Sequence, residues 1–140
     1  MRRRAQCGAA VNAGGPEGKT ALHLACAYGR TDCIHLLLES GADINAADSY
    51  QQTSLHAAAG FGHEAAVQLL FDAGAKVNAA QVQGSTALHL AALNGQTSIV
   101  RFLVQKGADA NIRDVDGLTA ADIARAERNN DVIRSQPHAV

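Results

Sequence analysis

A short segment occurs four times in this sequence, at intervals of 33 residues. The first copy begins at Thr20 and reads Thr-Ala-Leu-His-Leu-Ala, and the fourth begins at Thr119. Three glycines and three asparagines keep the same interval: Gly29, Gly62, Gly95, Asn45, Asn78 and Asn111. A period shared by independent residue types indicates one supersecondary unit that is repeated along the chain. Such a chain folds as a stack in which each unit contacts its neighbours.

These residues resemble the ankyrin repeat, whose unit is two antiparallel helices followed by a β-hairpin called the finger. The resemblance covers about residues 8 to 134. It implies an all-α solenoid of stacked helix-turn-helix units with β-hairpin fingers, and a surface that binds other proteins without chemistry of its own. The units are a partial N-terminal repeat or cap (1–14), three repeats (15–47, 48–80 and 81–113), a C-terminal capping repeat (114–136) and a tail (137–140).

Composition narrows the choice of partners. With 47% hydrophobic and 18% charged residues, the 140 residues suffice for one domain with a core. A net charge of -1 disfavours nucleic acid and anionic membrane surfaces. No apolar run reaches the roughly 18 residues of a membrane-spanning helix. We therefore expect another protein or peptide as partner, a monomeric state, and a cytoplasmic location, with the nucleus as an alternative.

Each repeated threonine is expected to cap a helix, because its side-chain oxygen can accept a hydrogen bond from a free backbone N–H. A glycine such as Gly29 ends this first helix, and a second helix follows that carries most of the core. At the second fingertip Gln51 stands where the other fingers have glycine, which costs about 1 kcal/mol if φ is positive there. The predicted core residues of the second helices are Cys33, Ile34, Leu36, Leu37, Leu38, Ala66, Val67, Leu69, Leu70, Phe71, Ile99, Val100, Phe102, Leu103 and Val104.

Both ends of the chain depart from the period. The first unit is partial, with Arg3 and Arg4 at core positions, so it is either a polar cap or part of a longer chain, and we favour the second reading. In the last unit Asp122 takes the place of the repeated histidine. The segment Arg128-Asn129-Asn130 replaces the glycine that ends the other first helices, and Asn129 can adopt the left-handed turn that glycine takes elsewhere. We expect Pro137 to end the last helix.

Three regularly spaced histidines could suggest a metal or catalytic site: His23, His56 and His89. Packed helices lie roughly 8 to 10 Å apart, whereas zinc needs its ligands about 2 Å from one point. We interpret these histidines as hydrogen-bonding spacers between threonine and neighbouring backbone. Three others are expected at solvated positions: His35, His63 and His138. The finger carboxylates Asp114 and Asp116 lack the rest of a calcium loop. The sequence therefore predicts no enzyme, no metal and no cofactor.

Three cysteines are an odd number, and none has the paired spacing of a zinc site or a redox dithiol: Cys7, Cys26 and Cys33. Cys26 replaces an alanine of the first helix, and Cys33 falls on the apolar side of the second helix. We expect both to be small core residues that remain reduced.

Residues that differ between the equivalent positions of the units are candidates for partner binding. Tyr28, Tyr50 and Phe61 are the predicted anchors, since aromatic side chains offer a large contact area at low entropic cost. The predicted binding residues, on the fingers and at the ends of the first helices, are Tyr28, Tyr50, Gln52, Phe61, Val82, Gln83, Leu93, Asn94, Val115 and Leu118. The middle fingers are uncharged, so we expect a partner segment that is apolar or neutral in its centre.

Two readings of the chain remain open. It is either the interaction segment of a larger scaffold or regulatory protein, or an independent adaptor or inhibitor. The repeat resemblance also implies candidates for asparaginyl hydroxylation in a eukaryotic host, because each follows a leucine by eight residues: Asn45, Asn78 and Asn111.

Overall fold

The computed structural model describes residues 11–135, and of residues 129–135 it describes the backbone alone. After a short 3-10 turn (Pro16–Gly18), the chain forms helices α2 (Ala21–Ala27), α3 (Thr31–Glu39), α4 (Ser54–Gly60), α5 (Glu64–Asp72), α6 (Ala87–Leu93), α7 (Thr97–Gln105) and α8 (Ala120–Ser135). Helices α2, α4, α6 and α8 are the first helices of the units, and α3, α5 and α7 are the second helices. The predicted all-α repeat solenoid is confirmed.

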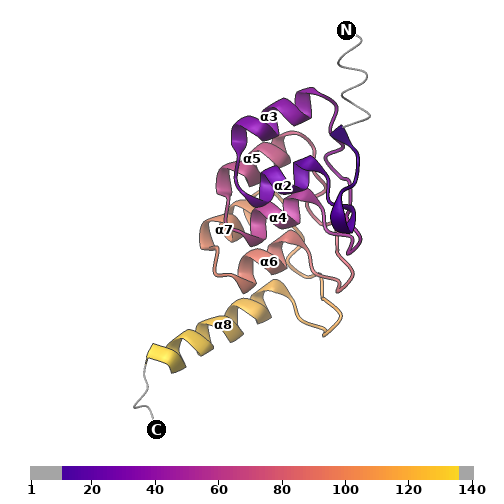
Figure 1. Ribbon diagram of the computed structural model, residues 1–140. Coiled ribbons are helices and arrows are strands. Elements are labelled where there is room, and N and C mark those ends of the chain that lie inside the picture. Colours follow the sequence, from indigo (N-terminus) through magenta and orange to yellow (C-terminus); the bar gives the residue numbers. More distant parts are fainter. Residues whose placement is uncertain (1–10, 136–140) are drawn as a thin grey trace.

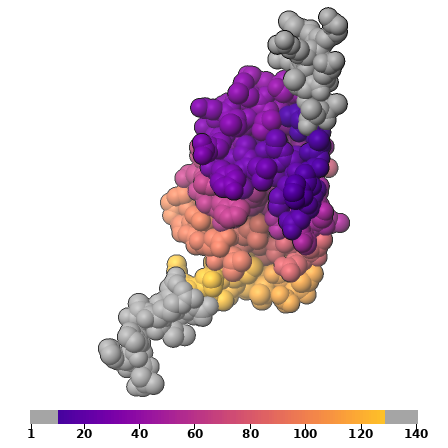
Figure 2. Space-filling model, in the orientation of Figure 1, coloured from indigo at the N-terminus to yellow at the C-terminus, as the bar shows by residue number. Residues whose placement is uncertain are grey.

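The helices form two layers. Along the first layer α2 packs on α4, α4 on α6 and α6 on α8, while in the second layer α3 packs on α5 and α5 on α7 (Figure 1). The long loops between the units, which include the fingers, gather along one side of the stack (Figure 1). Figure 2 shows that the stacked units join into one continuous body.

Helices α2, α4 and α6 each begin at a threonine that is paired with a histidine one turn later, whereas in α8 Asp122 takes the place of the histidine. The backbone N–H of Thr53 donates to His56 Nδ1 at 3.1 Å, and the side chain of Thr53 accepts from the backbone N–H of His56. His56 Nε2 lies 3.0 Å from the carbonyl oxygen of Ser85 in the next finger. The same arrangement occurs at Thr20 with His23 and at Thr86 with His89. The interpretation of these histidines as hydrogen-bonding spacers is confirmed.

The bonds of His56 favour the neutral ring. Because Nδ1 accepts from Thr53, the ring proton resides on Nε2 and is donated to Ser85. Burial lowers the pKa of His56 below its ordinary 6.5, although its bond to the Ser85 carbonyl opposes that shift. Protonation therefore favours the unfolded chain, whose histidine keeps the ordinary pKa.

This arrangement predicts acid destabilisation in a defined range. The free energy of unfolding should be constant above about pH 7 and should decrease as the pH falls below about 6.5, because the unfolded state then binds more protons than the folded state. Urea denaturation at pH 7.5 and 5.5 measures the difference, and an NMR titration of the His56 ring measures its midpoint. A stability that is equal at the two pH values contradicts the prediction.

Positive φ angles occur where the sequence predicts them. Gly29, Gly62 and Gly95 follow the first helices with φ of 67°, 81° and 69°. Gln51 also keeps a positive φ, 62°, at its fingertip. Within residues 11–135 the fingers are turns without assigned strands, so the hairpin character of the fingers is limited to bonds such as Asp48 N–H to the Gln52 carbonyl, 2.9 Å.

The core lies between the two helix layers, and three predicted core residues do not belong to it. Cys33, Leu36 and Val104 are exposed, Leu36 to 63% of its surface. Within residues 11–135 no helix pair lies on the outer side of α2 and α3, and none follows α7 to cover Val104. The prediction was wrong here because the repeat pattern identifies a stacking surface but not whether a neighbouring unit covers it. Among the second helices the fully buried residues are Ile34, Ala66, Val67, Leu70, Ile99 and Leu103.

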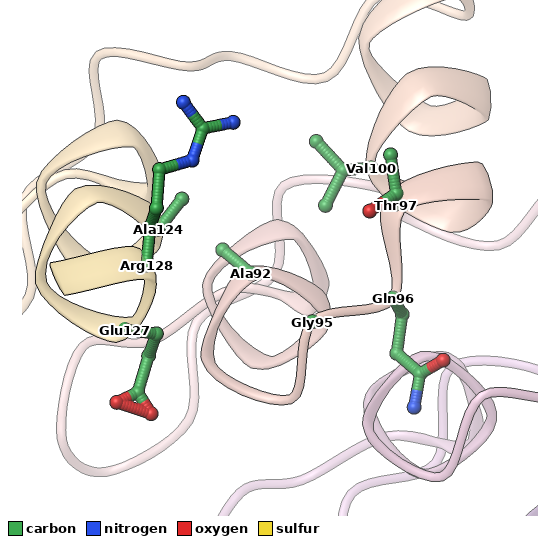
Figure 3. A pocket seen from close by; sticks show the side chains of 8 residues that line it. All are labelled: Ala92, Gly95, Gln96, Thr97, Val100, Ala124, Glu127 and Arg128. Carbon is green, nitrogen blue, oxygen red and sulfur yellow. The ribbon is translucent and has the colours of Figure 1, made fainter. Parts of the chain in front are cut away.

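The last unit also differs from the expectation. Helix α8 continues through Asn129 to Ser135, so the predicted left-handed turn is wrong. Arg128 holds the place of the helix-ending glycine, and a residue of this kind costs about 1 to 2 kcal/mol in the left-handed region but little within a helix, so without glycine the helix continues. Helix α8 diverges from the stack and leaves a groove of about 350 Å³, with Ala92 at its floor between Val100 of α7 and Ala124 of α8 (Figure 3).

The turn at Asn12 makes the same hydrogen bond to the following unit as the equivalent turn at Asn45. Asn12 Oδ1 accepts from the backbone N–H of Asp43 at 2.7 Å, as Asn45 Oδ1 accepts from Lys76 at 2.9 Å. Several predictions lie outside the described residues; they concern Arg3, Arg4, Cys7, Pro137 and His138.

Candidate functional site

The fingertips form one row of exposed side chains. Tyr50 is 47% exposed, and Val82, Val115 and Leu118 are exposed on the following fingers. The backbone N–H of Val82 donates to the carbonyl of Tyr50 at 3.0 Å, and that of Val115 donates to the carbonyl of Gln83 at 2.9 Å. Neighbouring fingertips therefore lie side by side in a fixed register. We call Tyr50, Gln52, Val82, Gln83, Val115 and Leu118 the fingertip row.

A polar side chain at the start of each finger holds this row in place. Asp48 Oδ1 accepts from the backbone N–H groups of Tyr50 and Gln52 at 2.8 and 2.9 Å. Gln81 and Asp114 play the same role in the next two fingers. The sequence did not lead us to predict that these side chains hold the fingers, although the 33-residue spacing of Asp48, Gln81 and Asp114 indicates a shared role.

Asp48 is also linked to the preceding finger. Lys19 Nζ lies 2.7 Å from its Oδ2. Burial of Asp48 acts to raise the pKa of its carboxyl group, but the bonds from Lys19 and from the backbone of Gln52 and Tyr50 hold that pKa below its ordinary value. The carboxylate that orients the Tyr50 fingertip is therefore ionised at neutral pH.

A second row lies at the C-terminal ends of the first helices. Tyr28, Phe61 and Asn94 cap α2, α4 and α6, and Phe61 is 66% exposed. Asn94 Nδ2 donates to the carbonyl of Gly60 at 2.8 Å, which ties the ends of α4 and α6 together. We call Tyr28, Phe61, Leu93 and Asn94 the helix-end row.

His63 lies close to the helix-end row, and the prediction that it is solvated was wrong. It is half-buried, and its Nε2 lies 2.9 Å from the carbonyl oxygen of Ala27 in the preceding unit. A histidine directly after the helix-ending glycine is close to the preceding first helix, so the side chain reaches that carbonyl. His63 therefore joins α2 to the unit that follows it.

The structure assigns the three predicted anchors to two rows. Tyr50 precedes α4 and Phe61 follows it, and a helix of seven residues is about 10 Å long. Tyr28 lies with Phe61 in the helix-end row. The two rows flank the first helices, so a partner that contacts Tyr50 and Phe61 together must cross α4.

The centre of this surface carries little charge. Residues 49–52 and 81–83 contain no charged side chain. Charged residues occur on the first and last fingers, where Lys19 pairs with Asp48 and Arg113 Nη1 donates to the Gly117 carbonyl at 2.8 Å. The surface therefore favours apolar and neutral contacts in its middle.

The described part of the chain offers few side chains that could bind a metal ion or act as a nucleophile. Residues 11–135 contain no cluster of three His, Cys, Asp or Glu side chains that could hold a metal ion. Burial raises the pKa of the Cys26 thiol to about 12, against a hydrogen bond with Ser54 that lowers it, so Cys26 stays protonated. None of the helices in this part of the chain is long and apolar enough to cross a membrane.

Stacked helix pairs with exposed finger loops define a repeat solenoid, a class of protein that presents an extended surface for binding. Two family models match the chain: one described as ankyrin repeats (3 copies) over residues 3–81, and one described as ankyrin repeats (many copies) over residues 77–124. This chain therefore belongs to the ankyrin repeat family, whose repeats are in general protein–protein interaction modules. No curated protein matches the sequence significantly.

Proposed function

We propose that this chain binds a partner protein on the concave surface bounded by the fingertip row and the helix-end row, as the interaction module of a scaffold or regulatory protein. The observation that carries the proposal is the set of large exposed apolar side chains in both rows, including Tyr50, Phe61 and Val115. Single exposed apolar residues are common on protein surfaces, but contiguous groups of them mark interaction sites.

The proposed partner segment is apolar or neutral where it meets the middle fingers. A charged segment would lose hydration against Tyr50, Val82 and Phe61 without gaining an opposite charge. Free Cys26 and Cys33 support a reducing location such as the cytoplasm. We expect no contribution from nucleic acid, because the net charge is -1.

Alanine substitutions test the proposed surface. Tyr50→Ala or Phe61→Ala should each weaken partner binding by about 1 to 3 kcal/mol, since buried interface aromatics are the usual hot spots. Affinity capture with the intact chain and with a Tyr28→Ala/Phe61→Ala double variant identifies the partner. Titration calorimetry with that partner then measures the affinities.

Matched controls lie on the opposite, convex side. Glu39→Ala, Asp72→Ala and Gln105→Ala change exposed residues of the second helices and should alter affinity by a few tenths of a kcal/mol at most. Thermal melts confirm that every variant is folded. Loss of binding in the convex set, with normal binding in the aromatic set, contradicts the proposed surface.

We also propose asparaginyl hydroxylation in a host that has the hydroxylase, at Asn45, Asn78 and Asn111. Asn45 and Asn78 each accept a hydrogen bond from the following turn, from the backbone N–H groups of Lys76 and Asp109. Peptide mass spectra of the protein from such a host should show an added oxygen on these asparagines, and spectra without it on any of the three contradict the proposal.

A further inference from the structure

Asn94 is the one asparagine of this sequence that precedes a glycine. An asparagine in this context is chemically reactive, because a following residue without a side chain leaves its backbone nitrogen free to approach the carbon of the asparagine amide. The dipeptide forms the turn after α6, where Asn94 is exposed and Gly95 has a φ of 69°. The equivalent positions after α2 and α4 hold Tyr28 and Phe61, so this turn alone combines the two residues.

The same turn is also the least covered of the three. A Cβ added at Gly29 would meet the His63 ring at 2.5 Å, and one added at Gly62 would meet the Gln96 amide at 2.6 Å. A Cβ added at Gly95 would meet no described atom within 4 Å. The difference arises because α8 continues where the last unit would otherwise turn, so that within residues 11–135 no later turn lies over Gly95.

Solvent reaches this turn through the groove that α8 leaves beside α6 and α7. Figure 3 shows Gly95 at the end of α6, where it lines the groove together with Ala92 and Gln96. The groove has a volume of about 350 Å³. That is room for several water molecules, each of which takes up about 30 Å³ in the liquid. The backbone at Gly95 therefore has both water and space beside it.

Two hydrogen bonds keep the reacting groups apart while the turn is closed. The Gly95 N–H donates to the Ala92 carbonyl at 3.2 Å, and Asn94 Nδ2 donates to the Gly60 carbonyl at 2.8 Å. The Asn94 ψ of 10° also places the Gly95 nitrogen beside the Asn94 backbone nitrogen and away from its side chain. The reaction therefore requires a local opening of the turn, which is easiest where no neighbouring turn has to be displaced.

We propose that Asn94 is a site of spontaneous modification, which converts it through a cyclic imide to aspartate and isoaspartate. The Gly95 nitrogen loses its proton to hydroxide and attacks Asn94 Cγ. An N–Cγ bond forms, the Cγ–Nδ2 bond breaks, and the amide nitrogen leaves as ammonia with a proton taken from water. Water then opens the ring at Cγ, which gives aspartate, or at the backbone carbonyl carbon of Asn94, which gives isoaspartate.

Either product changes the link between α4 and α6. A carboxylate replaces the Nδ2 donor, and it cannot donate to the Gly60 carbonyl. It also introduces a negative charge into the helix-end row, whose residues are otherwise uncharged. The modification therefore loosens the contact between the ends of α4 and α6. A further loss of partner affinity is expected from the new charge, and that expectation rests on the proposed function.

The test compares this turn with a covered turn in the same full chain. Phe61→Asn places the same dipeptide after α4, where Gln96 covers Gly62. The original chain and the variant are incubated at mildly alkaline pH, and conversion is followed by mass spectra of tryptic peptides and by enzymatic methylation of isoaspartate. The tryptic peptide of residues 77–101 also contains Asn78, which precedes an alanine and serves as an internal control.

In the folded variant Asn94 should convert at least about threefold faster than the asparagine introduced by Phe61→Asn, and in urea, where no turn is covered, the two rates should agree. Gly95→Ala should slow the conversion at least about tenfold in urea, where its strain in the folded turn has no effect. The rate should rise with pH, because the deprotonated Gly95 nitrogen is the nucleophile.

The effect on the stack is measured with Asn94→Asp, which carries the charge of the product. Amide hydrogen exchange at the end of α4 should be about two- to fivefold faster in this variant, through loss of the hydrogen bond to Gly60. Gln105→Glu, which adds a negative charge on the convex side, should leave that exchange unchanged.

Two outcomes overturn the inference. One is an Asn94 that stays as intact as Asn78 in the folded chain. The other is an asparagine introduced by Phe61→Asn that converts as fast as Asn94 in the folded variant, since the open turn then has no effect. These measurements do not involve a partner. An Asn94→Asp variant with faster exchange and unchanged partner affinity would instead contradict the part of the proposed function that concerns the helix-end row.

Discussion

Replacing Leu70 by alanine is expected to lower the free energy of unfolding by about 3 kcal/mol, within the 2 to 5 kcal/mol typical of buried leucines. Leu70 is fully buried in α5, between the units before and after it. The substitution removes its apolar contacts and leaves a cavity that neighbouring helices fill only in part. Because each unit depends on its neighbours, the loss should appear in one cooperative transition. Urea denaturation followed by circular dichroism measures it.

Leu36→Ala is the matched control. Leu36 lies in α3, one position before the equivalent of Leu70, and the sequence alone predicts both residues to be core. Since Leu36 is 63% exposed, its replacement should cost less than about 1 kcal/mol. Equal losses in the two variants would show that α3 is covered in solution.

Replacing His56 by alanine is expected to cost about 2 to 4 kcal/mol, because the change combines a cavity with unpaired polar groups. His56 is buried and joins Thr53, at the start of α4, to the Ser85 carbonyl of the next finger. Without the ring, the Thr53 N–H loses its acceptor in a site that water cannot easily reach. Thermal and urea unfolding at pH 7.5 measure the cost.

Two further variants separate the causes. His56→Leu restores most of the volume but none of the hydrogen bonds, so a loss close to that of His56→Ala assigns the effect to the bonds. His35→Ala changes an exposed histidine and should alter stability by less than about 0.5 kcal/mol. A His56→Leu variant as stable as the original chain would refute the role given to the bonds.

The individual residues of the candidate site could be proposed from the sequence, but their division into two rows could not. Tyr28, Tyr50 and Phe61 could be identified because they vary at equivalent positions of the repeat, and all three are exposed. Their division between two rows follows from the length of α4, which the sequence pattern indicates only roughly. The hydrogen bond between His63 and the Ala27 carbonyl joins two units, so the sequence of a single unit does not predict it.

The sequence by itself determined the internal structure of each unit, because the contacts involved are local. Thr53 and His56 are three residues apart, and their bonds form within one helical turn. Gly62 permits a positive φ through its lack of a side chain, wherever the unit lies in the stack.

Only the tertiary structure decided what happens at the ends of the array. Leu36 and Leu69 occupy equivalent positions, yet Leu36 is exposed and Leu69 is half-buried, because within residues 11–135 a helix pair precedes α5 but none precedes α3. At the other end, α8 continues through Arg128 and Asn129, since Arg128 stands in place of the helix-ending glycine and the left-handed turn is costly there, whereas the cost of helix is small. Burial is a property of neighbouring units, so a periodic sequence specifies the surfaces that stack, and the assembled stack alone specifies which of them remain exposed.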